Sequence, residues 1–222
     1  MTYLLAIDTT AGTSVALLAD DRVLALARHD SGVKHAELIG SAIAEMFDTT
    51  GVRREVLDAV VVGRGPGLFT GLRVGIAAGI FFAEATGAKL IGAVSHDALA
   101  LSLYETDGSL TEAPLLITTD ARRGEVYWGL YGGLSDAGLP VVLAGPSVGK
   151  HDTVLEMLSQ STNQYGALQE RTGGADAVWL ARLAAKQLAA GVASEDTSAL
   201  YLRAPDAALP KPNTQVGKRV SG

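Results

Sequence analysis

The sequence of 222 residues contains no cysteine, few aromatic residues and no excess of positive charge. The lack of cysteine excludes a disulfide scaffold, a thiolate zinc site and a thiol nucleophile. Aromatic residues make up 5% of the chain, which argues against a stacking platform for single-stranded RNA. The chain contains 18 lysine and arginine residues and 24 aspartate and glutamate residues, so its net charge is −6. That balance argues against general nucleic-acid binding but leaves a local basic patch open.

Long hydrophobic runs are also missing. No stretch reaches the roughly 18 apolar residues of a membrane span. The longest candidate, Val74–Ala83, is shorter and follows Arg73. The first apolar run has no basic region before it, which distinguishes it from a signal peptide. We therefore expect a cytoplasmic protein that does not contact a membrane.

The histidines lack the spacing of a metal site. The four are His29, His35, His96 and His151, and no two of them form a His-x-x-x-His pair. A zinc or iron site on one helix is therefore disfavoured, and the protease motif His-Glu-x-x-His is absent as well. We predict that no metal is bound.

The sequence does contain an alternation of apolar strands and amphipathic helices, and 48% of its residues are hydrophobic. This share is enough for a sizeable core. The order of elements predicts a mixed sheet covered by helices. Ser95 is the expected cap of the third helix. We expect strands at Tyr3–Ile7, Thr13–Leu18, Arg22–Ala27, Asp58–Val62 and Lys89–Ala93, and helices at Lys34–Phe47, Thr70–Ala85 and Ser95–Tyr104.

The second half resembles another copy of this order. A polar stretch, Thr106–Glu112, is the expected linker. The sequence from 204 to 222 is poor in apolar residues and is predicted to be a flexible tail. We expect strands at Pro114–Thr118, Glu125–Tyr131 and Val141–Leu143, and helices at Asp152–Leu158 and Ala175–Ala190.

A glycine-rich turn, Gly63–Gly67, leads into the second helix. Such a turn can present backbone N–H groups to an anion, but neither the Walker A lysine nor the Rossmann glycine spacing is present, which favours a ligand-free turn. In the helix, Gly71, Gly75 and Gly79 share one face. Each glycine costs about 1 kcal/mol of helix propensity, so another backbone should approach closely. The approaching backbone belongs either to this protein's own sheet or to a partner.

Asp8, Thr9 and Thr10 follow the first strand. An aspartate followed by small hydroxyl residues and glycine is how actin-like phosphotransferases hold Mg²⁺ and phosphate, but Asp8 could equally cap the turn. The matching turn of the second half contains one glycine and the bulky Arg122 and Arg123, which argues against a normal ATP clamp. These two arginines could contact RNA phosphate or an acidic partner, although a solvated turn is the simpler interpretation.

Four segments together resemble one known family. Ile7–Thr10, Gly65–Arg73, Asp120–Trp128 and Tyr201–Arg203 match the bacterial TsaB family, also called YeaZ or glycoprotease-like M22, in order and spacing. Leu68 stands where that family usually has serine. The resemblance covers about residues 1–203. It implies an α/β fold of two actin-like (ASKHA) subdomains, each a mixed sheet flanked by helices, at residues 1–103 and 104–203, followed by the tail.

The resemblance also implies a function. Members take part in forming N6-threonylcarbamoyladenosine (t6A) in tRNAs that read codons starting with A. The expected role is a non-catalytic partner of the transferase TsaD, joined by the ATPase TsaE and by tRNA through the complex, with a homodimer when alone. No cofactor is required, and weak ATP or ADP binding is expected at the complex interface. The alternative is an ATP-binding or ATP-hydrolysing enzyme with Asp8 at a Mg²⁺–phosphate site.

By position in the family, the first and second helices carry the partner surface, and Asp8, Thr9 and Thr10 form a vestigial nucleotide site. The interface residues implied in this way are His35, Leu38, Ile39, Ala42, Met46, Leu72, Arg73, Gly75, Ile76, Gly79 and Ile80.

Overall fold

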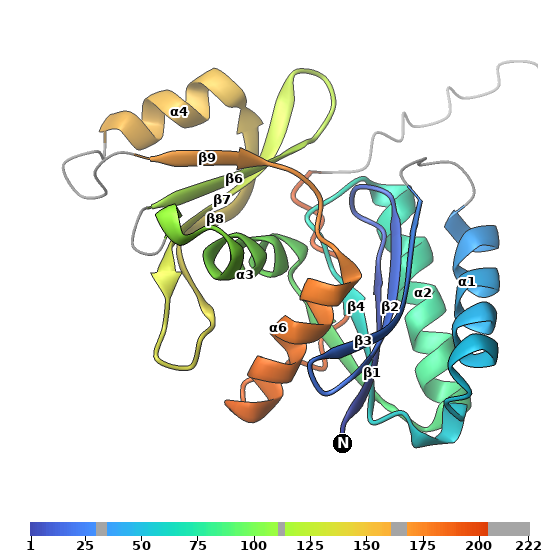
Figure 1. Ribbon diagram of the computed structural model, residues 1–222. Coiled ribbons are helices and arrows are strands. Elements are labelled where there is room, and N and C mark those ends of the chain that lie inside the picture. Colours follow the sequence, from blue (N-terminus) through green and yellow to red (C-terminus); the bar gives the residue numbers. More distant parts are fainter. Residues whose placement is uncertain (30–34, 111–113, 161–167, 204–222) are drawn as a thin grey trace, which may run out of the picture.

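Two mixed β-sheets lie beside one another in the computed structural model, which describes residues 1–29, 35–110, 114–160 and 168–203 (Figure 1). This confirms the predicted α/β class with two sheets flanked by helices. The predicted tail, 204–222, lies outside the described residues.

The first sheet has the strand order β3-β2-β1-β4-β5. Its first three strands form an antiparallel meander, whereas β4 and β5 run parallel to β1. The strands are β1 (Tyr3–Asp8), β2 (Thr13–Ala19), β3 (Arg22–His29), β4 (Ala59–Gly63) and β5 (Lys89–Ala93).

Helices cover both faces of this sheet, so β1 and β4 are buried along almost their whole length. α1 (His35–Thr50) and α2 (Phe69–Thr86) lie on one face, where Leu5 and Ile7 point. α6 (Ala177–Ala189) lies on the other face, against Leu4 and Ala6. Alternate side chains of one strand thus enter two different cores, as period-two geometry requires.

The second sheet has the order β8-β7-β6-β9. α3 packs on one face and α4 on the other, with Tyr131 buried beside α3 and Trp128 beside α4. The elements are α3 (Ser95–Thr106), β6 (Leu115–Asp120), β7 (Glu125–Leu134), β8 (Pro140–Lys150), α4 (His151–Gln160) and β9 (Gln169–Thr172), with short 3-10 turns at Arg54–Val56 and Gly108–Leu110.

Three expectations about these elements were wrong. Strand β9 was missed because Gln169–Thr172 is short and polar, and it is held by its parallel pairing with β6. α6 packs on the first sheet, so the segment after residue 104 does not form a separate packing unit. Ser95 is not the cap of α3: Val94 occupies that position, and the Ser95 hydroxyl donates to Asp8.

The glycine face of α2 meets this protein's own sheet. A Cβ at Gly75 would lie 2.3 Å from Thr9 Oγ1, and a Cβ at Gly79 would lie 2.1 Å from Val62 Cγ1. The close approach is therefore internal, and Gly75 and Gly79 are not free to contact a partner.

The 18-residue α2 is long and apolar enough to cross a membrane by length and composition alone, contrary to the expectation from run lengths.

Candidate functional site

Asp8 lies at the end of β1 and is 2% exposed. Its Oδ1 accepts hydrogen bonds from the Thr10 amide at 2.8 Å and from the Thr10 hydroxyl at 2.5 Å. Its Oδ2 accepts a hydrogen bond from the Ser95 hydroxyl at 2.6 Å. Both carboxylate oxygens are thus bound by donors of this chain, in agreement with the turn-capping alternative.

Burial raises the pKa of Asp8 above its usual value. The hydrogen bonds from Ser95 and Thr10 lower that pKa, and the negative charge of Asp176 raises it. Desolvation is the largest of these effects, because it penalises the charged form of a buried carboxyl group. Asp8 therefore holds its proton more readily than an exposed aspartate does.

The glycine-rich turn fits around the Asp8 turn. A Cβ at Gly63 would lie 2.0 Å from Asp8 Oδ2, and a Cβ at Gly67 would lie 3.1 Å from the Cα of Thr10. The Thr9 hydroxyl donates to the Gly71 carbonyl at 2.8 Å. These contacts explain the small residues of the turn by packing, which supports the ligand-free interpretation, and they connect the Asp8 turn directly to α2.

Two cavities flank the Asp8 turn. The larger, about 440 Å³, is the cleft between the two halves, and we call it the cleft. The smaller, about 200 Å³, lies near Arg28 and Asp176, which form an ion pair. The cleft is lined by the turn (Thr9, Thr10, Ala11 and Gly12), the start of α2 (Leu68, Thr70 and Gly71) and the β6–β7 hairpin (Thr119, Asp120 and Arg122).

β6 and β7 pair antiparallel and form a hairpin within Asp120–Trp128, one of the segments that carry the family resemblance. Its tip is left-handed at Arg122 (φ 64°), Arg123 (φ 59°) and Gly124 (φ 71°), a conformation that side chains other than glycine rarely adopt. Asp120 supports it by accepting from the Arg122 amide at 2.7 Å and by pairing with the Arg122 guanidinium at 3.2 Å. Arg122 thus lines the cleft with its positive charge partly offset by Asp120. Contact of Arg122 or Arg123 with RNA or a partner stays a prediction.

An apolar groove of about 500 Å³ runs between α1 and α2, and we call it the α1–α2 groove. Phe81 stands at its side with 75% of its surface exposed, and the neighbouring Ile80 is 41% exposed. Exposed apolar area of this kind marks an interaction surface more often than a solvated one. The groove is lined by Ile39, Gly40, Ile43, Val74, Ala77, Ala78, Phe81, Phe82 and Ala85.

The structure divides the predicted interface residues into two groups. One group is inside the monomer and consists of Ile39, Ala42, Met46, Leu72, Gly75, Ile76 and Gly79. Arg73 and Ile80 are exposed, Leu38 is half-buried, and the side chain of His35 lies outside what the structure describes. The contact of these helices with a partner stays a prediction, but seven of the eleven side chains belong to this chain's own core.

Sequence reasoning missed Phe81, the most exposed aromatic residue of the groove. A helix that is apolar nearly all round offers no polar side from which its outer face can be read. The spacing from the glycines could have identified it. Ala77 and Phe81 follow Gly75 and Gly79 by two positions, which places them on the opposite side of the helix, away from the sheet. Among the residues that the structure describes, no three histidine, aspartate or glutamate side chains gather in a way that suits a metal ion.

Comparison with known proteins adds sequence and structural relatives. Residues 29–171 match the family model described as TsaD, tRNA N6-adenosine threonylcarbamoyltransferase. An uncharacterized protein of Mycobacterium leprae is 47% identical over 93 residues, 42% of this chain and 22% of that protein. The Escherichia coli tRNA threonylcarbamoyladenosine biosynthesis protein TsaB is 37% identical over 134 residues, 58% of this chain and 54% of that protein. The chain thus spans about half, or less, of the length of these curated relatives.

A solved structure matches over most of the fold. YeaZ from Pseudomonas aeruginosa aligns with a TM-score of 0.72 and 28% sequence identity, covering 91% of this chain and 100% of that one. The α/β arrangement of two mixed sheets flanked by helices is therefore shared with YeaZ, as the resemblance to that family implied.

Proposed function

Because the chain belongs to the family described as TsaD, tRNA N6-adenosine threonylcarbamoyltransferase, and within it to the TsaB (YeaZ) group, we propose that it takes part in forming t6A in tRNA. Its proposed role is that of a non-catalytic partner that binds TsaD. The complex would also include the ATPase TsaE and tRNA, would work in the cytoplasm, and would require no cofactor on this chain. Alone, the protein would form a homodimer.

The state of Asp8 supports a non-catalytic role. Three hydrogen bonds from Ser95 and Thr10 already bind the two oxygens of Asp8, and these donors compete with a metal-bound water for the carboxylate. The raised pKa of Asp8 further weakens it as a metal ligand, because metal binding requires the deprotonated carboxylate.

The α1–α2 groove is the observation that carries the proposal. Burying a phenylalanine side chain contributes about 1.5–3 kcal/mol relative to leaving it exposed. Phe81 is 75% exposed beside an apolar groove, so this chain alone leaves most of that energy unused. A partner with a similar pair of apolar helices, as a paralogous chain would have, buries both surfaces at once.

Phe81→Asp is expected to abolish binding to TsaD while leaving the fold intact. The side chain makes little contact with its own core, so the substitution costs little stability but places a charge in the buried interface. We expect a loss of affinity of at least 100-fold, which is about 2.7 kcal/mol. Light scattering on a sizing column, with each variant mixed with TsaD, measures the complex directly.

Val142→Asp is the matched control, because Val142 is 46% exposed on the edge strand β8, far from the groove in sequence and packing. It should bind TsaD as the wild type does. Ile76→Glu would not test the idea, since Ile76 is 8% exposed and the charge would disturb the core. If Phe81→Asp bound TsaD normally, the groove would not be the docking surface.

The cleft favours a second function, nucleotide binding by an actin-like ATPase. It has about 440 Å³ of space, the Asp8 turn on one side and Arg122 on the other. Titration calorimetry with Mg²⁺ and ATP distinguishes the two functions, with Asp8→Asn as the comparison variant. Heat of binding that is lost in Asp8→Asn would support the enzyme, whereas no heat on either protein would exclude this function for the isolated chain.

A further inference from the structure

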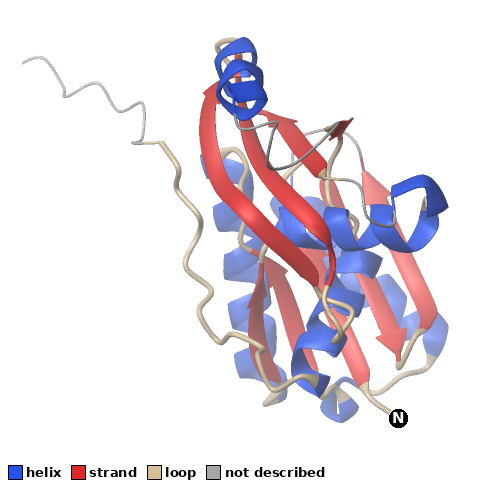
Figure 2. Cartoon of the chain, turned by 90° about the vertical axis from the view of Figure 1, so that its left-hand side faces the viewer, coloured by secondary structure: helices blue, strands red, loops and turns tan. Residues whose placement is uncertain are grey.

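Residues 194–203 follow α6 along the outside of the molecule, in a path that is neither helix nor strand (Figure 2). We call this segment the C-terminal strap. Its start lies directly on β5: the Gly92 amide donates to the Ser194 carbonyl at 2.9 Å, and a Cβ at Gly92 would lie 2.0 Å from the Asp196 carbonyl oxygen. Only glycine at position 92 lets the strap approach this strand.

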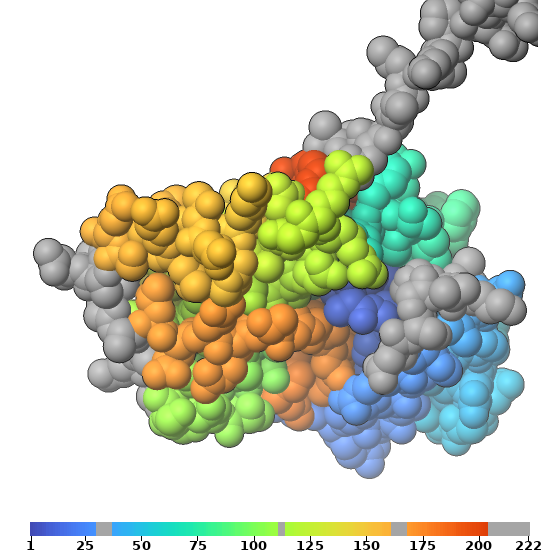
Figure 3. All heavy atoms as spheres, turned by 90° about the horizontal axis from the view of Figure 1, so that it is seen from above, coloured from blue at the N-terminus to red at the C-terminus, as the bar shows by residue number. Residues whose placement is uncertain are grey.

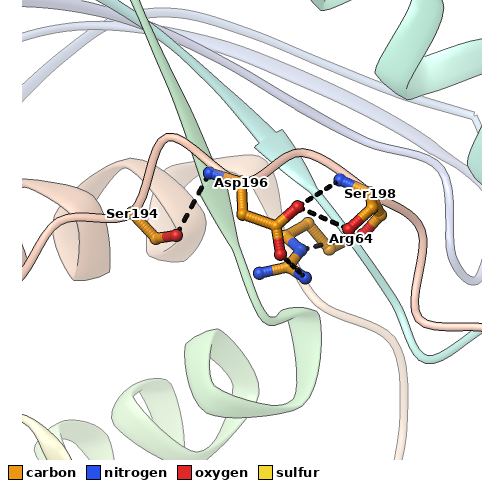
Figure 4. Close-up of polar contacts among 4 residues, drawn as sticks. All are labelled: Arg64, Ser194, Asp196 and Ser198. Carbon is orange, nitrogen blue, oxygen red and sulfur yellow. Dashed lines mark hydrogen bonds and ion pairs between the residues drawn. The ribbon is translucent and has the colours of Figure 1, made fainter.

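Arg64 fastens the middle of the strap to the first half. Its guanidinium pairs with Asp196 at 2.6 Å and donates to the Ser198 carbonyl at 2.9 Å (Figure 4). The Arg64 carbonyl in turn accepts from the Leu200 amide at 2.8 Å. Arg64 belongs to the glycine-rich turn, so the strap is attached to the same turn that packs around Asp8.

Tyr201 then crosses the start of α2. Its ring lies 4.8 Å from the Phe69 ring, and its hydroxyl accepts from Arg73 Nε at 2.9 Å. The Arg73 guanidinium also lies 3.9 Å from the centre of the Phe69 ring, within cation–π distance. These three side chains hold the strap at one side of the cleft.

Arg203 carries the strap onto the second half. Its guanidinium donates to the Ala121 carbonyl at 3.2 Å and pairs with Glu125. Ala121 lies between Asp120 and Arg122, which line the cleft. From above, the end of the strap lies beside the hairpin (Figure 3). One surface segment, in part exposed and in part half-buried, therefore joins the two sides of the cleft mouth.

We propose that the C-terminal strap is a releasable clamp that sets the opening of the cleft, with Arg203 as its positioning residue. Behind the cleft the halves are joined by buried contacts: the first turn of α3 joins Ser95 to Asp8 of the first sheet and His96 to Thr119 of the second, and Ala98 and Leu101 of α3 pack in one core with α6. In this proposal the first turn of α3 is the hinge. Ala199 packs against the core cluster of Val62, Leu72 and Ile76, whereas Tyr201 is 45% exposed, so the end of the strap from Tyr201 onward can detach without opening that core.

Pulsed electron paramagnetic resonance on the full chain tests the clamp. Because the protein has no cysteine, Asp48→Cys on α1 and Glu156→Cys on α4 place one spin label on each half. In this background, Arg203→Met is expected to lengthen and broaden the distance between the labels. The Glu125 amide, which donates to the Arg122 carbonyl, should exchange with deuterium about tenfold faster, equivalent to about 1.4 kcal/mol.

Two further variants separate clamping from general stability. Arg203→Lys keeps the ion pair with Glu125 and should restore most of the wild-type distance. Arg171→Met removes an arginine that pairs with Asp107 at 3.4 Å, away from the strap, and should leave the distance unchanged. An unchanged distance in Arg203→Met, or an equal change in Arg171→Met, would overturn the clamp. The proposal does not rest on TsaD binding, because the experiment uses this chain alone.

Discussion

Replacing Gly79 with alanine should lower the free energy of unfolding by about 1–3 kcal/mol. Helix propensity alone predicts the opposite, because alanine is favoured over glycine by about 1 kcal/mol in a helix. The new Cβ would lie 2.1 Å from Val62 Cγ1, however, and Val62 is fully buried on a central strand. Since neither α2 nor β4 can move away without disturbing its other contacts, we expect overpacking to outweigh propensity.

Gly40→Ala is the matched control for this prediction. Gly40 also lies inside a helix, but nothing is within 4 Å of a Cβ placed there. Propensity acts alone at this position, so alanine should stabilise the protein by up to about 1 kcal/mol. Urea unfolding followed by circular dichroism gives both values. Stabilisation by both substitutions would show that α2 can shift away from the sheet and that the glycines do not mark an obligatory contact.

The order of elements could be predicted from the sequence because it depends on local periodicity. The first-half strands follow apolar runs, and the meander β1–β3 appears where it was expected. β9 could not be predicted, because Gln169–Thr172 has no apolar pattern and gains its structure from pairing with β6. The position of α6 on the first sheet likewise depends on tertiary packing, which no local signal contains.

The candidate site divides in the same way. Asp8 was found from its place after a strand, but its partner Ser95 is 87 residues away and had been assigned to a helix cap. The glycines of α2 were correctly identified as a point of close approach, whereas the choice between sheet and partner required the position of Val62. That α1 and α2 carry the partner face stays a prediction, but seven of its eleven predicted residues are in the core, because apolar side chains look alike in sequence whichever way they point.

His96 and Asp97 should make the free energy of unfolding depend on pH in opposite directions. Each dependence becomes visible when the other residue is replaced. His96 is buried, and burial lowers its pKa from 6.5 to about 4. Asp97 accepts a hydrogen bond from the Tyr131 hydroxyl at 2.8 Å, and desolvation raises its pKa from 3.8 to about 6. Both residues lie in the first turn of α3, so both effects report on the hinge between the halves.

The sign of each effect follows from the protons bound in the folded and unfolded states. Between pH 6.5 and about 4 the unfolded chain protonates His96 and the folded protein does not, so stability falls as the pH falls. Between pH 3.8 and about 6 the folded protein keeps the Asp97 proton and the unfolded chain does not, so stability rises as the pH falls. Each effect changes the free energy of unfolding by about 3 kcal/mol over its pH interval. In the wild type the two changes largely cancel where the intervals overlap, between about pH 4 and pH 6.

Asp97→Asn should expose the His96 effect, with stability falling by about 3 kcal/mol as the pH is lowered from 6.5 to 4. The asparagine oxygen can still accept from Tyr131, so the contact between α3 and β7 persists. His96→Gln should expose the Asp97 effect, with stability rising by a similar amount over the same interval. Urea unfolding at steps of half a pH unit measures both slopes.

The difference from the wild type at each pH isolates the two residues. Asp8 and His151 also have shifted pKa values, but they are present in all three proteins and cancel in the comparison. Because the two variants must diverge in opposite directions, a general loss of stability cannot produce the result. Parallel pH profiles for the wild type and both variants would mean that water reaches His96 and Asp97 in solution, and that the first turn of α3 is not a buried hinge.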